Sequence, residues 1–333
     1  MSALLNPSRA PVAADSFHEP IADDLLEVER ILHCHLSSAR PGVARLLSHL
    51  DNYRGKRLRP ALLLLTARAC GTVAPAHHVL AAVVEMIHTA TLVHDDVLDS
   101  ASVRRHAATV NAAWGNQASI LLGDYLFTHA FHLCSTLDDP RACRIIGEST
   151  NRVCAGELHQ ISARGNLCLG EEEYLAIIDA KTAELTSCCC RLGALFANVP
   201  AETVELLASF GRYLGLSFQI ADDLLDLVGD ENRAGKSLGT DLDQQKLTLP
   251  LIRLLARAPE AQANRVRQVL RQQENHKREA LAPDLASSGA VEEARATAEE
   301  FARRARRCLE CLPASESRDL LAGLTVRVVH RQA

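Results

Sequence analysis

The sequence predicts an all-α fold. Valine, isoleucine and the aromatic residues are sparse relative to alanine and leucine, and aromatic residues make up only 4% of the chain. That bias favours helix over sheet. Apolar residues recur at helical spacing, no stretch alternates in the manner of a strand, and a hydrophobic content of 47% is ample for a core.

The chain of 333 residues divides into a tail and one domain. Residues 1–20 are rich in Ala, Pro and Ser and lack the apolar core of a signal peptide, so we expect a loose tail there. Residues 21–333 are expected to form a single all-α domain. Arg68, Glu85 and His88 interrupt the longest apolar runs, so no segment is expected to span a membrane.

The net charge and the cysteine content limit the classes of partner and the cellular setting that we expect. A net charge of −5 argues against nucleic acid as a partner. The eleven cysteines are odd in number and scattered, which is unlike a disulfide framework and indicates a reducing, cytoplasmic setting. Cys308 and Cys311 form a lone Cys-x-x-Cys pair within a charged helical pattern, which we interpret as two helix positions rather than a zinc site.

A basic stretch follows the first helical region. The helical pattern of residues 21–50 breaks at Pro41-Gly42, and residues 55–60 then read Gly-Lys-Arg-Leu-Arg-Pro, directly before an apolar run. A glycine followed by basic residues at a helix start brings side-chain cations and free backbone N–H groups together, which suits an anion. The alternative is a solvated basic turn.

Three carboxylates, Asp95, Asp96 and Asp99, end the next apolar helix, and Arg104 and Arg105 follow. Positions i and i+4 share a helix face, so Asp95 and Asp99 point the same way and repel each other. Mg²⁺ would relieve the repulsion, since it is usually held by one or two carboxylates and substrate phosphates. The arginines suit the same phosphates. The alternative for one such cluster is a solvated acidic helix end.

Two further helices precede a second acidic cluster. Residues 115–135 are apolar on nearly every face, so this helix is expected to be buried all round or to pack against another subunit. Residues 171–173 are three glutamates suited to a helix N-terminus, and the helix that follows carries Lys181 and Thr182.

Asp222, Asp223 and Asp226 repeat the spacing of the first cluster at the end of another apolar run. Two such clusters can face each other across one cavity, with several Mg²⁺ ions and a diphosphate between them. A polar loop at residues 229–239 with Lys236 follows, and then Lys246, as expected for a mobile lid that carries cations.

In this order, these motifs resemble those of the trans-polyprenyl diphosphate synthases, and most of all the long-chain, octaprenyl-type members, over roughly residues 20–330. The resemblance implies an isoprenoid-synthase helical bundle around a deep central cavity, with several Mg²⁺ ions as cofactor. It implies metal-binding and catalytic roles for Asp95, Asp96, Asp99, Asp222, Asp223 and Asp226, and a catalytic role for Lys181. It assigns isopentenyl diphosphate to Lys56, Arg59, His88 and Arg105. It assigns the allylic diphosphate to Arg104, Lys181, Thr182, Gln219, Lys236 and Lys246.

The sequence departs from that family at two positions. His106 stands where Gly usually follows the two arginines, and Gln245 stands where Gly commonly precedes Lys246. The first departure concerns the geometry of the loop after Arg105. The second concerns the reach of Lys246 into the site.

The resemblance implies a head-to-tail condensation without a protein nucleophile. Metal and cations stabilise the departing diphosphate, an allylic carbocation forms, the double bond of isopentenyl diphosphate attacks it, and a proton is lost. The expected partners are isopentenyl diphosphate, an allylic diphosphate (farnesyl or geranylgeranyl) and a second copy of the chain as a homodimer. The product would be released to the membrane.

Product length is predicted from the helix below Asp95. Short-chain members of the family that the chain resembles carry a bulky ring at the first level, whereas here Ala90 and Thr91 are small and Ile87 gives no aromatic floor at the next turn. We therefore expect a hexaprenyl to decaprenyl product, octaprenyl as the single best value. Candidates for a deeper floor are Phe127, Phe131, Leu133 and Cys134.

Other functions fit the motifs less completely. A class I terpene cyclase or a head-to-head synthase of the squalene type would leave Lys56, Arg59 and His88 without a second diphosphate to bind. An inactive partner subunit would be expected to have lost aspartates, and none is lost. A shorter-chain farnesyl or geranylgeranyl diphosphate synthase remains the alternative for product length.

Overall fold

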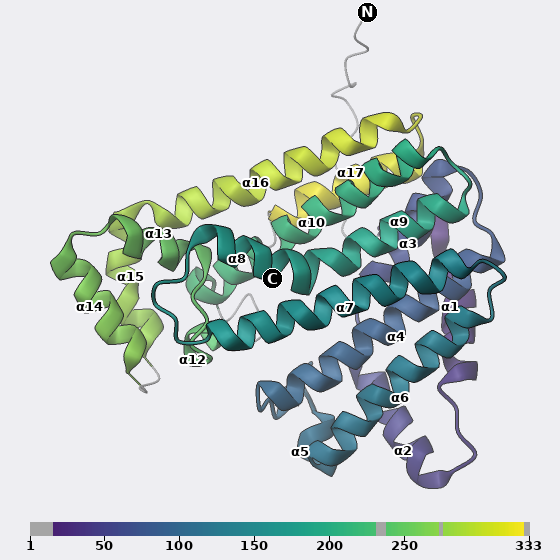
Figure 1. Ribbon diagram of the computed structural model, residues 1–333, viewed down its shortest axis with the longest axis horizontal. Helices are drawn as coiled ribbons and strands as arrows, with labels where there is room; N and C mark the ends of the chain where they lie inside the picture. The colour runs from purple at the N-terminus through teal and green to yellow at the C-terminus, as the bar shows by residue number, and fades with distance from the viewer. Residues whose placement is uncertain (1–15, 231–237, 273–275, 330–333) are drawn as a thin grey trace, which may run out of the picture.

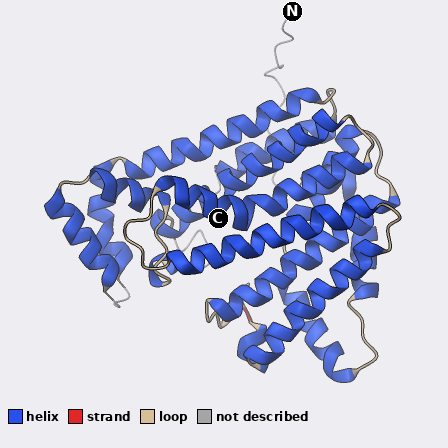
Figure 2. Cartoon of the chain, in the orientation of Figure 1, coloured by secondary structure: helices blue, strands red, loops and turns tan. Residues whose placement is uncertain are grey.

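The computed structural model describes residues 16–230, 238–272 and 276–329. Helices make up nearly all of the described chain, as Figures 1 and 2 show. The α-helices are α1 (Ala22–His35), α2 (Pro41–His49), α3 (Leu58–Cys70), α4 (Pro75–Leu98), α5 (Val110–Trp114), α6 (Asn116–Ser135), α7 (Pro140–Ala163), α8 (Glu171–Ile178), α9 (Glu184–Phe196), α10 (Ala201–Val228), α12 (Thr240–Asp243), α13 (Leu249–Arg257), α14 (Glu260–Arg271), α15 (Lys277–Ser288), α16 (Ala290–Cys308) and α17 (Glu316–Val329). Short 3₁₀ helices are η1 (Ser16–Ile21), η2 (Leu50–Tyr53) and η4 (Leu309–Cys311). The all-α prediction is confirmed.

The first described helix begins before the predicted domain boundary. The sequence predicts a loose tail up to residue 20, but Ser16–Ile21 is the 3₁₀ helix η1. Phe17 and Ile21 are buried in the main apolar cluster, where they pack with residues of α1 and α3. Two large apolar side chains are enough to dock a short segment, and a boundary set at residue 20 by composition misses them.

Long helices pack in a bundle whose centre is built from α3, α4, α9 and α10. Helix α10 lies between α9 and α16, and α4 packs against α6 (Figure 1). Helix α3 is buried almost throughout, from Ala61 to Leu65 without exposure. Helix α4 is long and apolar enough for a membrane span by length and composition alone, yet 61% of its most apolar stretch is buried within the protein. That burial is typical of a core helix of a folded domain.

One small hairpin departs from the prediction that no strand is present. β1 (Val103–Arg104) pairs antiparallel with β2 (Ala107–Ala108), directly after α4. The two residues of the turn, Arg105 and His106, both have positive φ, at 50° and 64°. Two left-handed residues make the type I′ turn whose twist matches paired strands. A strand of two residues is too short to leave an alternating pattern in the sequence.

Between α8 and α9 the helix widens into a π-turn, η3 (Asp179–Ala183). Such turns hold one extra residue and are frequent at functional sites. Helix α7 approaches this turn closely at Gly156, where a Cβ atom would lie 2.7 Å from both Ala180 Cβ and Lys181 N. Glycine at 156 therefore lets α7 pack against the turn that carries Lys181.

Two segments predicted as helices are helical. The apolar stretch at residues 115–135 corresponds to α6, which is not buried all round within the chain, since Leu121 is 67% exposed. The glutamates at residues 171–173 occupy the first turn of α8, where the helix dipole favours negative charge.

Candidate functional site

A pocket opens among α7, α8, η3, α10 and the segment after α12. Its lining includes Lys181, Thr182, Gln219, Asp223 and Lys246. These five residues come from positions 181 to 246 of the sequence, and the structure brings them to one place. Each was predicted from the sequence as a site residue.

The first aspartate motif divides by helix face, as i, i+4 geometry requires. Asp95 and Asp99 are partly exposed, while Asp96 is fully buried. Asp96 accepts a hydrogen bond from Tyr53 Oη at 2.5 Å and bonds to Arg104 through Nε at 3.0 Å and Nη2 at 2.8 Å. Its carboxylate is committed to protein partners, which makes it a poor metal ligand.

Cations of the protein surround the other two carboxylates of this motif. Arg164 Nη2 donates to Asp99 Oδ1 at 2.7 Å, and Lys246 Nζ lies 3.9 Å from Asp99 Oδ2. Burial raises the pKa of Asp95 to about 6; Lys181 opposes the shift, and Asp99 adds to it. Asp95 and Asp99 therefore form a negatively charged site that a cation would stabilise.

Lys181 lines the pocket and is held there by two polar partners. Its Nζ lies 2.5 Å from Glu157 Oε2 and donates to Gln160 Oε1 at 2.7 Å. Burial alone would lower the pKa of Lys181, but the charges of Asp95 and Glu157 outweigh it and raise the pKa. Lys181 is thus a protonated cation close to Asp95.

The second aspartate motif continues a chain of hydrogen bonds. Thr182 Oγ1 donates to Gln219 Oε1 at 2.8 Å, Gln219 Nε2 donates to Asp223 Oδ1 at 2.7 Å, and Tyr174 Oη donates to Asp223 Oδ2 at 2.5 Å. The chain fixes the orientation of the Gln219 amide. Burial and the nearby charge of Asp241 raise the pKa of Asp223.

The third carboxylate of that motif has a structural task. Asp226 is 3% exposed and accepts hydrogen bonds from Thr240 N, Thr240 Oγ1 and Asp241 N, the start of α12. Its backbone carbonyl also accepts from Gly239 N at 3.0 Å. Asp226 therefore caps α12 and joins it to α10.

A basic cluster that includes Arg57, Arg59 and Arg105 surrounds His88. Arg57 is neutralised by Glu29 and by the buried Glu85, with N–O distances of 2.6 Å to each. Arg59 has no such partner: its Nε is buried and makes no hydrogen bond within the described residues. Burial, followed by the charges of Arg59 and its neighbouring arginines, lowers the pKa of His88 well below the usual value. His88 is therefore neutral, in a basic environment in which Arg59 has no carboxylate partner within the described residues.

Arg105 completes the basic cluster. Its Nη1 donates to the carbonyl of Tyr53 at 2.6 Å, and a Cβ at Gly55 would lie 2.5 Å from its Nη2. Burial and the charge of Arg104 lower the pKa of Arg105. Glycine at 55 gives the guanidinium room against the backbone, beside the predicted anion site.

Comparison with known proteins decides the family. The family model described as Polyprenyl synthetase matches residues 40–283. The chain belongs to the polyprenyl synthetase family. Members of this family are prenyltransferases, so the chain is a transferase of that type.

Several relatives align with this polyprenyl synthetase over almost its whole length. It is 36% identical over 318 residues to the octaprenyl diphosphate synthase of Escherichia coli (strain K12), spanning 95% of this chain and 98% of that one. A decaprenyl diphosphate synthase structure from Rhodobacter capsulatus superposes with a TM-score of 0.90 at 36% identity, covering 96% and 99% of the chains. A polyprenyl synthase from Caulobacter crescentus CB15, complexed with calcium and isoprenyl diphosphate, gives a TM-score of 0.91 at 34% identity, covering 98% and 100%.

The divalent metal that this polyprenyl synthetase family implies fits the donors present. Asp95 and Asp99 offer oxygen ligands on one helix face, and Asp222 is the partly exposed carboxylate of the second motif. Within the described ranges no three acidic, His or Cys side chains form a ready metal cage. The donors are thus few and hard, which suits a divalent cation whose coordination is completed by phosphates and water.

The departures from the family pattern do not displace the cations. Lys246 reaches Asp99 although Gln245 replaces glycine, because Gln245 itself adopts φ 56°. His106 likewise adopts the left-handed conformation that glycine favours. Lys236, predicted as an allylic-side cation, lies outside the described residues.

Sequence reasoning missed several residues that hold the site together: Tyr53, Glu157, Gln160, Arg164 and Tyr174. One signal was available, because the second aspartate of each motif lies about 100° around the helix from the first. It therefore faces inward and needs a buried donor. The identity of that donor is not encoded locally.

Proposed function

We propose that this chain is a Mg²⁺-dependent trans-polyprenyl diphosphate synthase that condenses isopentenyl diphosphate with an allylic diphosphate to a long-chain product, octaprenyl as the single best value. The observation that carries the proposal is a second anion site apart from the aspartates. Arg59 Nε is buried without a partner among the described residues, beside neutral His88. A buried unpartnered charged donor is costly, and a bound diphosphate would satisfy it. A terpene cyclase binds only one diphosphate, so this second site would have no ligand.

The residues divide the work of the reaction. Lys181 and Arg104 would hold the allylic diphosphate, with Asp95, Asp99 and Asp222 as the holders of Mg²⁺. Bound Mg²⁺ would neutralise charge on the departing diphosphate. Thr182 and Gln219, whose orientations are fixed by their hydrogen bonds, would also bind the allylic diphosphate.

Carbon–carbon bond formation then needs no protein nucleophile. The C–O bond of the allylic diphosphate breaks and its electron pair leaves with diphosphate. The double bond of isopentenyl diphosphate attacks the cation, and a proton lost to the released diphosphate restores a double bond. Lys56, Arg59, His88 and Arg105 would keep the second diphosphate in place throughout, with the neutral imidazole of His88 as an uncharged donor.

Two enzymatic readouts test the second anion site. With ¹⁴C-labelled isopentenyl diphosphate, the wild-type chain should yield polyprenyl products. Arg59→Ala should raise the KM for isopentenyl diphosphate by roughly 10- to 100-fold, since a charge-assisted contact is worth about 1.5–3 kcal/mol. Lys181→Ala should instead raise the KM for the allylic substrate. Arg68→Ala, on the same helix but 49% exposed, is the matched control. An equal rise in both KM values for Arg59→Ala would contradict separate sites.

Support for a long product comes from α4 and from the names of the relatives. Thr91 is partly buried one turn below Asp95, and Ile87 lies deeper in the apolar core. Ala90, however, packs in a closed cluster with Leu47 and Tyr53. A bulky ring at Ala90 would overpack that cluster at a cost of about 1–3 kcal/mol, so Thr91 is the better position to test.

The floor of the tunnel has four candidate residues. Phe127 stacks on His94, directly before Asp95, with ring centroids 5.9 Å apart, which favours the other three. Phe131 approaches Gly147 of α7 and, with Leu133 and Cys134, remains a candidate floor. Thr91→Phe should shorten the product to farnesyl or geranylgeranyl length, and Thr91→Val should not. Chromatography of the dephosphorylated products measures the length, and an unchanged product from active Thr91→Phe would place the tunnel elsewhere.

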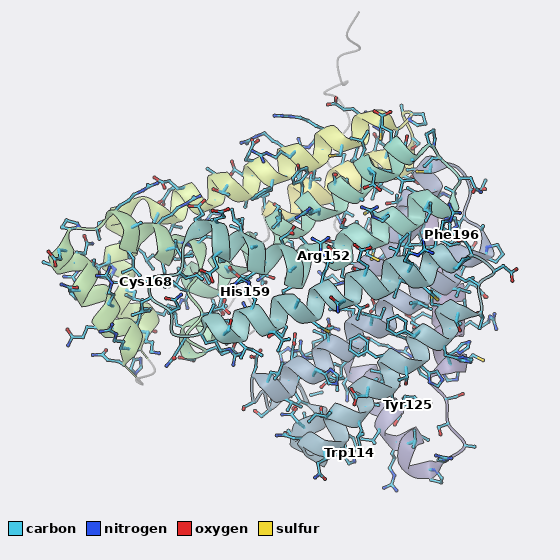
Figure 3. The ribbon with its side chains drawn as sticks, in the orientation of Figure 1. Trp114, Tyr125, Arg152, His159, Cys168 and Phe196 are labelled. Carbon is cyan, nitrogen blue, oxygen red and sulfur yellow. The ribbon has the colours of Figure 1, made fainter. Side chains whose placement is uncertain are left out.

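A homodimer is supported by the exposed face of α5 and α6. Trp114, Ile120 and Leu121 are 41%, 45% and 67% exposed there, and Figure 3 shows Trp114 and Tyr125 on the same flank of the molecule. A second copy of the chain would cover these apolar side chains. The proposed setting is the cytoplasm, with product passed to a membrane. Light scattering at micromolar concentration should give twice the chain mass, and a monomer mass would reject the dimer.

A further inference from the structure

Tyr53 contacts both arginines that follow the first aspartate motif. Its hydroxyl donates to Asp96 Oδ2 at 2.5 Å, and Asp96 in turn holds Arg104 through two guanidinium nitrogens. The Arg104 guanidinium also lies over the Tyr53 ring, 5.8 Å from its centroid. The backbone carbonyl of Tyr53 accepts from Arg105 Nη1 at 2.6 Å. One residue therefore orients Arg104 with its side chain and Arg105 with its main chain.

The tyrosine itself is fixed from several sides. Tyr53 is 4% exposed and packs with Ala90, Val93 and Val110 in a buried cluster. Its oxygen accepts a hydrogen bond from Val110 N at 3.2 Å, so its single proton is directed to Asp96. Burial and the hydrogen bond to Asp96 raise the pKa of Tyr53, which keeps the hydroxyl protonated. Because Asp96 is fully buried, no solvent water replaces this donor.

The two arginines have different expected ligands. Under the proposed function, Arg104 binds the allylic diphosphate and Arg105 binds isopentenyl diphosphate. A bond between two bound substrates forms only when their reacting carbons are held about 3–3.5 Å apart, so the relative position of the two diphosphates matters. A rigid residue that touches both arginines can set that relative position.

We propose that Tyr53 is a positioning residue that sets the relative placement of the two diphosphate sites. Its hydroxyl acts through Asp96 on Arg104, and its carbonyl acts on Arg105. The residue ends η2 and stands two positions before Gly55, so it also anchors the start of the loop that carries Lys56 and leads into α3, where Arg59 lies. This inference rests on the proposed function.

Tyr53 acts on Arg104 through its side chain and on Arg105 through its main chain, so removal of one side-chain atom tests the proposal. Tyr53→Phe removes only the hydroxyl and leaves the carbonyl bond to Arg105 in place. The KM for the allylic diphosphate should rise about 5- to 20-fold, less than for loss of a direct charged contact, because the hydroxyl acts through Asp96. The KM for isopentenyl diphosphate should stay within about twofold of wild type, as expected when the Arg105 contact is untouched. Calorimetric titration with inorganic diphosphate and Mg²⁺ should show weakened binding without any turnover.

Tyr213→Phe is the matched control. Tyr213 lies on α10 and stacks on Phe301 of α16, with centroids 6.2 Å apart. It should leave both KM values and diphosphate binding unchanged. Melting temperature is measured for both variants, but KM does not depend on the folded fraction, so the ratio of the two KM values stays informative if Tyr53→Phe is less stable.

The outcomes separate this inference from the proposed function. An allylic KM that rises alone, with weaker diphosphate binding, supports positioning by Tyr53. A wild-type chain that elongates prenyl diphosphates, together with Tyr53→Phe that changes neither KM or changes both equally, overturns the positioning role alone. A wild-type chain that forms no elongated product with any allylic diphosphate overturns the proposed function and this inference together.

Discussion

The two aspartate motifs have the same spacing, yet the fold uses their last carboxylates in different ways. Asp99 faces the cations Arg164 and Lys246 and is partly exposed. Asp226 is buried and bonded to the backbone N–H groups of Thr240 and Asp241. The reason is the length of each helix: α4 ends at Leu98, so Asp99 is its C-cap, whereas α10 continues to Val228, two residues past Asp226. A motif fixes which side chains share a helix face, and neighbouring elements decide what each one does.

The second carboxylates are alike. Asp96 and Asp223 are both buried, and each accepts a 2.5 Å hydrogen bond from a buried tyrosine, Tyr53 or Tyr174. The tyrosines come from η2 and α8, which are unrelated in sequence position. The six carboxylates expected to act together therefore separate into three that are partly exposed, Asp95, Asp99 and Asp222, and three that are buried, Asp96, Asp223 and Asp226.

The largest effect is expected at the first carboxylates, where the motifs should behave alike. Asp95→Ala and Asp222→Ala should each lower turnover by at least about 100-fold in saturating Mg²⁺, because each removes a hard ligand from a site of developing charge. Melting temperature should change little. Asp138→Ala, an exposed aspartate in the loop between α6 and α7, is the control. Near wild-type turnover in either variant would refute a metal shared between the motifs.

A different effect is expected at the third carboxylates, where the motifs should diverge. Asp226→Ala removes an acceptor from Thr240 and Asp241 and should lower the free energy of unfolding by about 1–3 kcal/mol. Asp99→Ala should lower turnover with a smaller loss of stability, since its partners are partly exposed. Urea unfolding and steady-state kinetics on both variants measure the contrast. Equal stability losses would mean that Asp226 is no more structural than Asp99.

The smallest effect is expected at His106 and Gln245, the two positions where the sequence departs from the family pattern. Both adopt positive φ without being glycine, at 64° and 56°. The left-handed conformation costs a non-glycine residue about 1–2 kcal/mol, while glycine loses about 0.4–1 kcal/mol more entropy on folding. His106→Gly and Gln245→Gly should therefore raise the free energy of unfolding by under about 1 kcal/mol, with turnover within about twofold. A large loss of turnover in either variant would mean that the replaced His106 or Gln245 side chain itself takes part in binding or catalysis.

The sequence predicts the helical class, the helix at residues 115–135 and the two acidic helix ends because each is a local pattern. Apolar spacing reports a buried face, and i, i+4 spacing reports which carboxylates point together. The sequence could not show that Arg57 is neutralised by Glu29 and Glu85, which lie 28 positions away on either side. From the sequence Arg57 looks like its neighbours, and only the fold shows that Arg57 is paired while Arg59 Nε is buried without a hydrogen bond in the described part of the chain.

The same limit explains the remaining differences. A hairpin of two-residue strands is set by turn conformation, which a His at position 106 conceals. Tyr174 and Asp223 are 49 positions apart and meet only because α8 packs beside α10. Such pairs depend on tertiary packing, and no local composition or periodicity reveals them.

The π-turn at Asp179–Ala183 has a consequence for how such a site can change over generations. A π-turn holds one residue more than the α-helix around it, so deletion of a single codon within it would restore a regular helix. Because the wide turn absorbs that extra residue, such a deletion would leave the flanking helices close to their present orientation and would change the turn itself. Lys181 and Thr182 would leave the register that aims them at Asp95 and Gln219. Helices α8 and α9 could survive as helices while the site between them was lost, so this point separates inheritance of the fold from inheritance of the chemistry.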